Sequence, residues 1–514
     1  MAVLTTNELL TLGFGLGFFY TASLIVYRLS LSPLAKFPGP TLAAATLWYE
    51  YYYDVVKRGR YTWKIAELHA QYGPIVRISP YELHIDDPEW VLTMNYAEPY
   101  ADGDSYYDEL YVGPSTRRTL KYGWSVRGFG PLNYTFATIG HEHHRIRRGA
   151  LAPFFSKTLV QQLEPSVQAM VDKLTTRLEG FKGTGTIINM IDMYPCLTTD
   201  IICQYAFGAP YGYLDMPKFS PLWHRAVMEA SEGSHFFKQF PWIESAMRQM
   251  PQAVVRTMAP KLASLFLLVD MVHEKVSKVQ ADLKAGVKIQ GQRTIFHELL
   301  TNDQLSPEEK TPERLAAEGV GLVAAGSMTV AHTLSVISYN IITDPMILAK
   351  LQAELAKSQT KSNSSLKWSQ LEQLPYLSAI IQEGFRLQRI SPDIDLQYGG
   401  RSIPRGTPVG MTSIMMHNNP EHFPNGHEFD PERWLQPNAS QLRKYLVPFS
   451  KGSRQCLGMN LAYCELYITL AAVFAPGRFQ FELFETDASD AEVGHDFFNA
   501  CQRVDSKGIR VKIA

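Results

Sequence analysis

The sequence contains few cysteines and carries almost no net charge. Its 514 residues include five cysteines, an odd number, and no spacing among them suggests paired bridges. A reducing compartment is therefore favoured over a disulfide-stabilised secreted fold. The net charge of −1 gives no reason to expect a nucleic-acid partner. We also find no internal repeat and no Gly-rich dinucleotide-binding fingerprint, so nothing indicates a nucleotide domain in the chain.

Charged residues are also missing from one stretch near the N-terminus. Leu9–Tyr27 is a run of nineteen uncharged residues between Glu8 and Arg28. At ~1.5 Å rise per residue, the run nearly matches a hydrocarbon core of ~30 Å. It predicts a transmembrane anchor rather than a cleaved signal peptide, because no basic residue precedes it and the apolar run is long. Since Arg28 and Lys36 follow the run, the positive-inside rule places the body of the protein in the cytosol.

The remainder of the sequence indicates one large domain. Three prolines within residues 33–40 make a stiff spacer after the anchor. Residues 41–130 hold short strand-like runs, 141–355 are mostly helical in pattern, and strand signals return after residue 390. We therefore expect a mainly α fold with small β-sheets (α+β). The predicted organisation is a lumenal N-terminus at 1–8, an anchor at 9–27, a hinge at 28–40 and a single domain at 41–514.

A second charge-free run lies in a long predicted helix. Thr311 and Pro312 suit the N-cap and first helical position, and Pro345 marks the end. Gly319–Ile342 holds twenty-four residues without a charge, so a second transmembrane span is an alternative. Several glycines, serines and threonines within the run favour a buried helix at the centre of a large domain.

The segment Phe449–Gly458 carries the most specific chemical signal in the chain. It places Cys456 in a glycine-bounded loop, with Arg454 two residues before the cysteine and Phe449 seven before it. Glycines such as Gly452 let backbone N–H groups approach the sulfur and hold its charge. A cysteine thiolate pushes electron density onto haem iron strongly enough to favour O–O cleavage. The loop therefore suggests an oxygen-activating metal centre.

Small residues interrupt the long predicted helix at one point. Ala325 and Gly326 would let a flat group lie against the backbone, and Thr329 could present a hydroxyl to it. The alternative is that Thr329 merely bonds to a carbonyl one turn back, which is what this short pattern favours on its own.

A carboxylate and two arginines suggest a charge network. Glu383 and Arg386 are three apart in a helical run and share a face. Arg433, in a later aromatic segment, offers a second cation to the same carboxylate. Such a buried network has to be fully paired to be tolerated.

Residues 140–148 are dense in histidine and arginine. A solvated basic helix face explains this composition, and a metal site from His141, His143 and His144 is a weaker alternative because no further ligand completes it at a familiar spacing. His141 and Arg145 are four apart on one helix face, which suits an anionic cofactor group.

Taken together and in this order, these segments resemble a cytochrome P-450, a membrane-anchored haem-thiolate monooxygenase. The cysteine loop matches the pattern FxxGxRxCxG at every specified position, and the similarity runs from the Pro-rich hinge to about Arg510. Segments around residues 34–40 and 72–80 are similar to the fungal branch that includes trichodiene oxygenase, which mostly tailors terpenoids and polyketide-derived scaffolds.

The resemblance implies a haem b cofactor and roles for the residues above. Cys456 would be the proximal iron ligand with Phe449 packed beside it, and Arg454 would pair with a haem propionate. His141 and Arg145 occupy the family's WxxxR positions with His in place of Trp, and would serve the propionates too. Thr329 would help deliver protons. The structural triad would be Glu383, Arg386 and Arg433, and the other cofactor contacts Gly452, Ala325 and Gly326.

The resemblance also implies the reaction and its partners. Electrons would come from NADPH through a separate membrane reductase, the substrate would be a lipophilic small molecule, and the protein would be a monomer in the endoplasmic reticulum membrane. Met328 stands where the family usually has an acid, and a thioether cannot relay a proton. Met328 therefore keeps one alternative open, which is peroxide rearrangement or oxidative coupling without oxygen insertion. A remote alternative from a different class is a non-catalytic haem-binding membrane protein.

Overall fold

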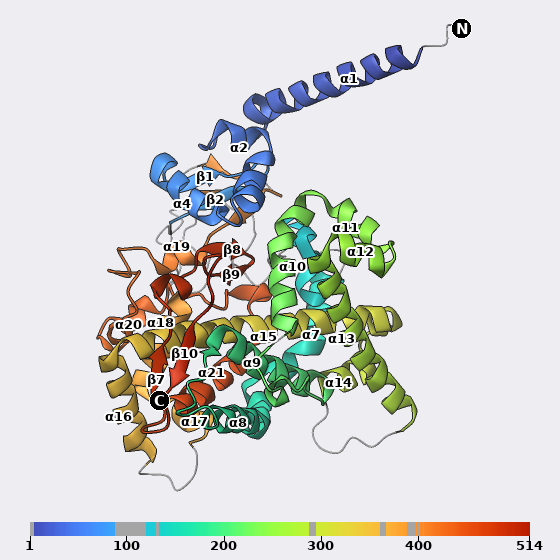
Figure 1. Cartoon of the computed structure of the whole chain (residues 1–514). Helices are drawn as coiled ribbons and strands as arrows, with labels where there is room; N and C mark the ends of the chain where they lie inside the picture. Colours follow the sequence, from blue (N-terminus) through green and yellow to red (C-terminus); the bar gives the residue numbers. More distant parts are fainter. Residues whose placement is uncertain are drawn as a thin grey trace.

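Helices form most of the computed structural model, and short strands gather on the side away from α13 (Figure 1). The structure describes residues 5–87, 120–129, 133–220, 222–286, 294–359, 366–387, 397–398, 401–404 and 406–514. The longer helices are α1 (Thr6–Val26), α4 (Tyr61–Tyr72), α7 (His141–Leu151), α8 (Lys157–Glu179), α9 (Met190–Phe207), α10 (Leu222–Gln239), α13 (Pro260–Lys284), α15 (Pro312–Thr343), α16 (Pro345–Gln359), α18 (Pro375–Arg386) and α21 (Met459–Val473). The shorter ones are α2 (Thr41–Ala45), α3 (Trp48–Tyr51), α6 (Gly123–Val126), α11 (Pro241–Arg248), α12 (Gln252–Met258), α14 (Ile295–Thr301), α17 (Trp368–Leu371), α19 (Ser413–His417) and α20 (Ala439–Leu442).

Among the described residues, the strands pair into sheets of two or three. The strands are β1 (Ile75–Arg77), β2 (Leu83–Ile85), β3 (Ile188–Asn189), β4 (Gln397–Tyr398), β5 (Arg401–Ser402), β6 (Val409–Gly410), β7 (Phe481–Leu483), β8 (His495–Phe497), β9 (Asn499–Cys501) and β10 (Arg510–Ile513). In one sheet β2 pairs antiparallel with β1 and parallel with β6, so the sheet joins the two halves of the chain as expected. In another, β10 lies between β3 and β7. The mainly α fold with small sheets is thus confirmed.

Helix α15 runs through the centre of the molecule (Figure 1). The Thr311 side chain caps it by accepting a hydrogen bond from the Arg314 N–H at 3.3 Å, and the helix ends before Pro345, as the sequence predicts. Most of it is buried, with α9, α13, α18 and α21 packed around it. Its apolar run therefore belongs to the protein core, and the transmembrane alternative for this segment is set aside.

Helix α8 shows how the apolar spacing produces this packing. Ser156 caps its N-terminus, where its hydroxyl accepts from the Leu159 N–H at 3.4 Å. The buried residues recur at spacings of three and four along the helix and face α9 and α21. These are Val160, Leu163, Val167, Val171, Leu174 and Leu178. Burial of this stripe fixes α21, which directly follows the Cys456 loop.

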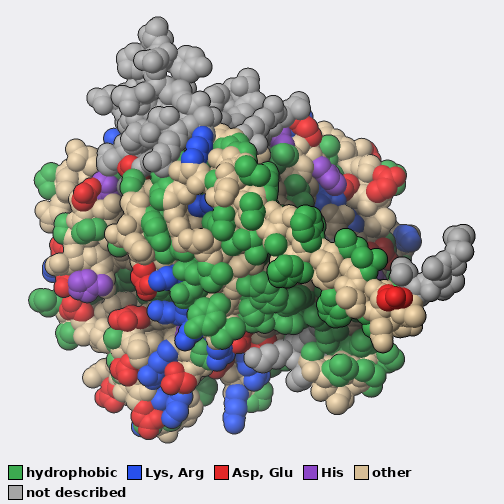
Figure 2. All heavy atoms as spheres, turned by 90° about the horizontal axis from the view of Figure 1, so that it is seen from above, with side chains coloured by type: hydrophobic (Ala, Val, Ile, Leu, Met, Phe, Trp, Pro, Cys, Tyr) green, Lys and Arg blue, Asp and Glu red, His purple; other side chains and the backbone are tan. Residues whose placement is uncertain are grey.

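Helix α1 projects from the body (Figure 1). None of its residues is buried, so its apolar side chains are exposed along its length. Thr5 and Glu8 form a capping box at its start, and it continues through a short π-helical turn, Tyr27–Leu31. The continuous stretch Thr6–Leu31 is long and apolar enough to cross a membrane, which makes it a candidate anchor. Figure 2 looks onto the end of the molecule that carries α1, and hydrophobic side chains gather over it.

Candidate active site

The Cys456 loop leaves α20 and leads into α21, and its backbone is tightly turned. Ser450 and Gly452 adopt positive φ angles of 55° and 74°, and Gly452–Arg454 forms a single 3₁₀ turn. The Cys456 N–H then donates to the Phe449 carbonyl at 2.8 Å, which closes the loop. Glycine suits the left-handed conformation at position 452 because it has no Cβ.

The Cys456 thiol lies in a setting that can hold a thiolate. Its side chain is accessible, but the surrounding protein atoms raise the pKa of the thiol through desolvation. The Gly458 backbone N–H and the positive charge of Arg148 act in the opposite direction and favour the charged form. The predicted help from backbone N–H groups therefore comes from the glycine that follows the cysteine.

Aromatic packing ties this loop to the helix that carries Glu383. The Phe449 ring lies 4.8 Å from Phe385 on α18, centroid to centroid, at an interplanar angle of 70°. It also lies 5.5 Å from the ring of Tyr463 on α21. The Phe449 ring is thus held between α18 and α21.

Glu383, Arg386 and Arg433 come together as the sequence predicts, with Glu383 and Arg386 completely buried. Arg386 donates from Nε and Nη2 to Glu383 Oε1 at 3.0 and 2.7 Å, and Arg433 Nε donates to the same oxygen at 3.2 Å. The remaining Arg386 donors reach backbone carbonyls, including that of Glu428 at 2.9 Å. This full pairing is what allows a buried charge network to persist.

Two further residues of this network were not predicted from the sequence. Trp434 Nε1 donates to Glu383 Oε2 at 2.8 Å. His417, also fully buried, lies with Nδ1 2.7 Å from the Arg386 carbonyl, and its Nε2 accepts from the Val447 N–H at 3.0 Å. Because Val447 precedes the cysteine loop directly, His417 links the triad to the start of that loop. Trp434 could have been predicted, because it directly follows Arg433 in the sequence. No residue near His417 in the sequence indicates that His417 belongs to the network.

Helix α7 presents a different pair of residues from the one expected. His144 is buried and Arg148 is close enough to Cys456 for the two charges to interact. Arg145, by contrast, is 74% exposed and pairs with Glu142 at 3.0 Å. His141 is half-buried at the edge of the group. The basic pair expected near the thiol was His141 and Arg145. The structure instead brings His144 and Arg148, each three residues further along α7, toward the Cys456 loop.

His144 and Arg148 belong to a cluster of basic residues that includes Arg454. Burial, followed by the charges of Arg454 and Arg148, lowers the pKa of His144 to about 3. Burial and then Arg148 lower the pKa of Arg454 to about 10. Burial also lowers the pKa of Arg148, and two neighbouring arginines disfavoured in this way are stabilised by an anionic group. The cluster therefore fits the carboxylates of a haem, while the Cys456 thiol supplies the soft donor for its iron. Among the described residues, no group of three or more His, Cys, Asp or Glu side chains could hold a metal ion, so the His141–His144 metal alternative has no support.

Helix α15 supplies a face of small residues in the interior. Ala325 and Thr329, one turn apart, are exposed although most of the helix is buried. The Thr329 hydroxyl donates to the Ala325 carbonyl at 3.1 Å, which is the local bond considered as the alternative. A Cβ at Gly326 would lie 2.8 Å from Ile202 of α9, so this glycine makes room for the packing of α9 on α15. Its contact with the cofactor stays a prediction. Met328 is buried in the core cluster and lies off the Thr329 face.

The thiol donor beside a carboxylate-binding cation cluster is the arrangement that a haem-thiolate protein requires. The chain belongs to the cytochrome P450 family, which it matches over residues 124–498. It is 41% identical to cytochrome P450 monooxygenase MO6277 of Ascocoryne sarcoides, with 96% of both chains covered. It is 40% identical to tryptophan 6-hydroxylase fscE of Fusarium equiseti, covering 96% of this chain and 94% of that one. It is also 40% identical to N-acetyltryptophan 6-hydroxylase ivoC of Emericella nidulans, covering 96% and 95%.

These relatives place the chain among the monooxygenases of fungal secondary metabolism, and the protein is an oxidoreductase. Family membership implies haem iron as the cofactor. The alternative of a non-catalytic membrane protein is accordingly set aside.

Proposed function

We propose that the protein inserts one oxygen atom of O₂ into a lipophilic fungal secondary metabolite, with electrons from NADPH delivered by a separate membrane reductase. The observation that carries this proposal is the Cys456 thiol in its glycine-bounded loop, beside the Arg148 charge and the Gly458 N–H. A haem bound there supplies the oxygen activation. The chain is proposed to fold its residues 41–514 as one catalytic domain and to act as a monomer.

The residues of the chain divide the remaining tasks. Cys456 would ligate iron as the thiolate, while Arg454, Arg148 and His144 would hold the haem carboxylates. Thr329 would hold and pass a proton on the opposite face. Its hydroxyl hydrogen is directed to the Ala325 carbonyl, so its oxygen keeps lone pairs that can accept from a donor in the site.

Aromatic side chains support a lipophilic substrate. The rings of Phe136 and Phe498 lie 5.5 Å apart, edge to face, and both residues are exposed. Tyr134, two residues before Phe136, packs on Gly321 of α15, which is one turn before Ala325. Phe498 links β8 and β9 with a φ of 66°, a conformation that a bulky residue rarely adopts. These rings would form an apolar wall beside the Thr329 face.

The substrate class has two candidates. Terpenoid or polyketide scaffolds follow from the resemblance to the fungal branch. An indole is the second candidate, because two of the relatives named above are hydroxylases of tryptophan and N-acetyltryptophan. Each is 40% identical to this chain, close to the 41% of the third relative. Both classes carry flat or apolar carbon frames that suit an aromatic wall.

We further propose that α1 anchors the protein in the endoplasmic reticulum membrane with the catalytic domain in the cytosol. The apolar length of Thr6–Leu31 supports the anchor. Trp48 on α3, Trp242 on α11 and Met258 on α12 are also exposed. Exposed tryptophan beside an anchor suits a membrane interface.

The buried position of Met328 bears on the alternative reaction. Peroxide rearrangement was considered because a thioether would replace an acid at the oxygen face. Since Met328 is 4% exposed and packs in the core, its side chain does not occupy that face. No other feature of the described residues favours this alternative.

The test is co-expression of the full chain with an NADPH–cytochrome reductase, with products analysed after supplying tryptophan, N-acetyltryptophan or extracts of terpenoid and polyketide scaffolds. We expect a product heavier by one oxygen atom that requires both the reductase and O₂. Thr329→Val should lower product and raise peroxide per NADPH consumed, because valine keeps the shape without the hydroxyl. Product formation with peroxide and no reductase, without oxygen gain, would instead support rearrangement.

A further inference from the structure

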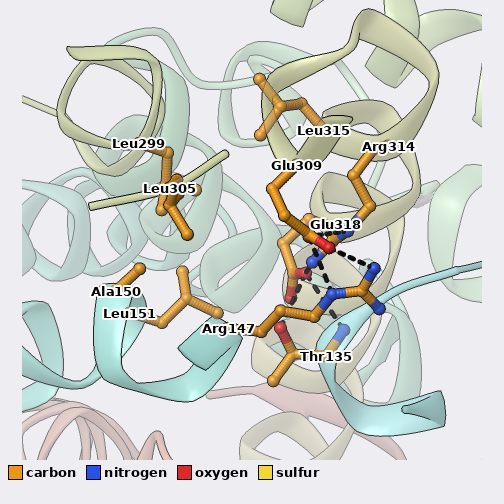
Figure 3. Close-up of a pocket in the computed structure, with 10 residues that line it drawn as sticks. All are labelled: Thr135, Arg147, Ala150, Leu151, Leu299, Leu305, Glu309, Arg314, Leu315 and Glu318. Atoms are coloured by element: carbon orange, nitrogen blue, oxygen red, sulfur yellow. Dashed lines mark hydrogen bonds and ion pairs between the residues drawn. The ribbon is translucent and has the colours of Figure 1, made fainter. Parts of the chain in front are cut away.

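Four charged side chains form a buried network between α7 and α15. We call this set, Arg147, Glu309, Arg314 and Glu318, the charge clamp. Figure 3 shows it at one side of a cavity, where the side chains of the clamp point toward one another. The side chains are 2%, 12%, 8% and 4% exposed, respectively. Two positive and two negative charges are thus held together almost out of water.

The contacts run in a chain through the clamp. Arg147 binds Glu309 with two parallel hydrogen bonds, from Nε to Oε2 and from Nη2 to Oε1, both 2.8 Å long. Arg314 Nε donates to Glu309 Oε2 at 2.9 Å, and Arg314 Nη2 lies 2.6 Å from Glu318 Oε2. Glu309 lies in the 3₁₀ turn Pro307–Lys310, so the clamp joins α7, this turn and the first turns of α15. Paired, forked geometry of this kind is the strong form of an ion pair.

The Glu309 carboxylate keeps its charge at neutral pH. Burial alone would raise the pKa of Glu309, but hydrogen bonds from Arg147 and His143 and the charges of Arg147 and Arg314 outweigh burial and lower its pKa to about 2. The carboxylate is therefore fully charged when the protein works near neutrality.

One end of the clamp reaches the Cys456 loop through a single intermediate residue. Arg147 Nη1 donates to the Thr138 hydroxyl at 2.8 Å. The Thr138 carbonyl accepts from Arg454 Nη1 at 2.7 Å. Since Arg454 lies two residues before Cys456, the clamp connects with the loop that carries the thiol.

The other end of the clamp reaches the Thr329 face. Glu318 accepts from both the N–H and the hydroxyl of Thr135, at 3.1 and 2.8 Å. Glu318 precedes Thr329 by eleven residues, which is about three helical turns and returns to the same face of α15. On α7, Arg147 lies between His144 and Arg148, the two residues that approach Cys456 and Arg454. The clamp therefore fixes the separation of the two helices that line the site.

We propose that the charge clamp is a positioning element that holds α7 against α15 and so controls how firmly the chain retains its haem. This inference rests on the proposed haem site. The clamp residues touch neither the thiol nor its loop directly, so their effect on the cofactor passes through His144, Arg148 and Arg454. Removing one member leaves three charges that no longer balance, so a net charge stays buried and the helices then separate to admit water.

The test is the rate at which the haem-loaded full chain transfers haem to apomyoglobin. We expect Arg147→Met and Glu309→Gln each to speed haem transfer by about tenfold or more. The double variant should transfer haem more slowly than either single variant, because its remaining pair, Arg314 and Glu318, carries no net buried charge. Glu142→Gln on α7 is the matched control, since it removes an exposed ion pair and should leave the rate unchanged. Arg147→Lys should restore part of the retention, because it keeps the charge without the fork.

A purely structural contribution would give a different pattern. In that case the unfolding midpoint in urea would fall without any change in the transfer rate measured far below that midpoint, and the proposal would be overturned. Should either single variant fail to fold, Glu318→Gln keeps an acceptor for Thr135 and carries the same prediction. If the wild-type chain binds no haem, the proposed function fails as well. If the wild type retains haem and all variants match it, only the clamp proposal fails.

Discussion

The ring of Phe385 lies 4.8 Å from the ring of Phe449, centroid to centroid, at 70° to it. Phe385 lies between Glu383 and Arg386 on α18, and Phe449 begins the loop that ends at Cys456. The edge-to-face contact therefore transmits the rigidity of the buried triad to the cysteine loop. His417 makes a second link, from the Arg386 carbonyl to the Val447 N–H. Stability of the triad and geometry of the thiol are thus coupled.

Glu383→Gln is expected to lower the free energy of unfolding by ~3–5 kcal/mol, because two buried arginines lose their counter-charge. Urea unfolding of the purified protein measures this change. The matched control is Glu179→Gln, which breaks the 3.0 Å pair with Arg478 at a site where the glutamate is 47% exposed. That change should cost less than about 1 kcal/mol. Equal losses in the two variants would contradict the role assigned to Glu383.

Arg148→Met is expected to weaken haem retention, whereas Arg145→Met should not. Arg148 lies close enough to Cys456 for their charges to interact, and its loss removes one cation from the cluster that fits the haem carboxylates. The Arg145 side chain is 74% exposed and pairs with Glu142. Haem content after purification, measured as the ratio of Soret to protein absorbance, distinguishes the two. If only Arg145→Met lowered the haem content, Arg145 rather than Arg148 would be the cation that holds the haem, as first expected from the sequence.

Glu465 on α21 predicts a pH-dependent stability. Its side chain is fully buried, neither carboxyl oxygen has a hydrogen-bond partner among the described residues, and burial raises its pKa well above the usual value. A carboxyl with a raised pKa in the folded state loses its stabilising contribution as pH rises above the unfolded value of about 4.3. Glu465→Gln, which stays neutral, should match the wild type near about pH 4 and become progressively more stable than it toward about pH 8. Urea midpoints across this range measure the difference, and a constant difference would count against a neutral, buried Glu465.

Part of the fold was predictable because its signals are local. The cap at Thr311, the stop at Pro345 and the strand runs at 75–78 and 82–85 each depend on a few neighbouring residues, and the structure contains all of them. The pairing of β2 with β6 could not be read from either strand, because it joins residues more than three hundred apart.

The site was predictable to the same degree. Glu383, Arg386 and Arg433 meet because three-residue spacing and an aromatic neighbour restrict their positions. On α7, the pairs His141–Arg145 and His144–Arg148 have the same spacing, so only burial against the Cys456 loop distinguishes them. Gly326 looked like room for a flat group, but its lack of a side chain serves the contact with Ile202. Such contacts depend on partners far away in the sequence.

The central claim is that Cys456 ligates haem iron as a thiolate. The most direct measurement is the absorbance spectrum of the reduced, CO-bound protein, taken for the wild type and for Cys456→Ser. We expect the long-wavelength Soret band of a thiolate complex in the wild type and its loss in the variant, with haem still detectable by its pyridine adduct. A wild-type spectrum without that band, or a Cys456→Ser spectrum that keeps it, would contradict the account.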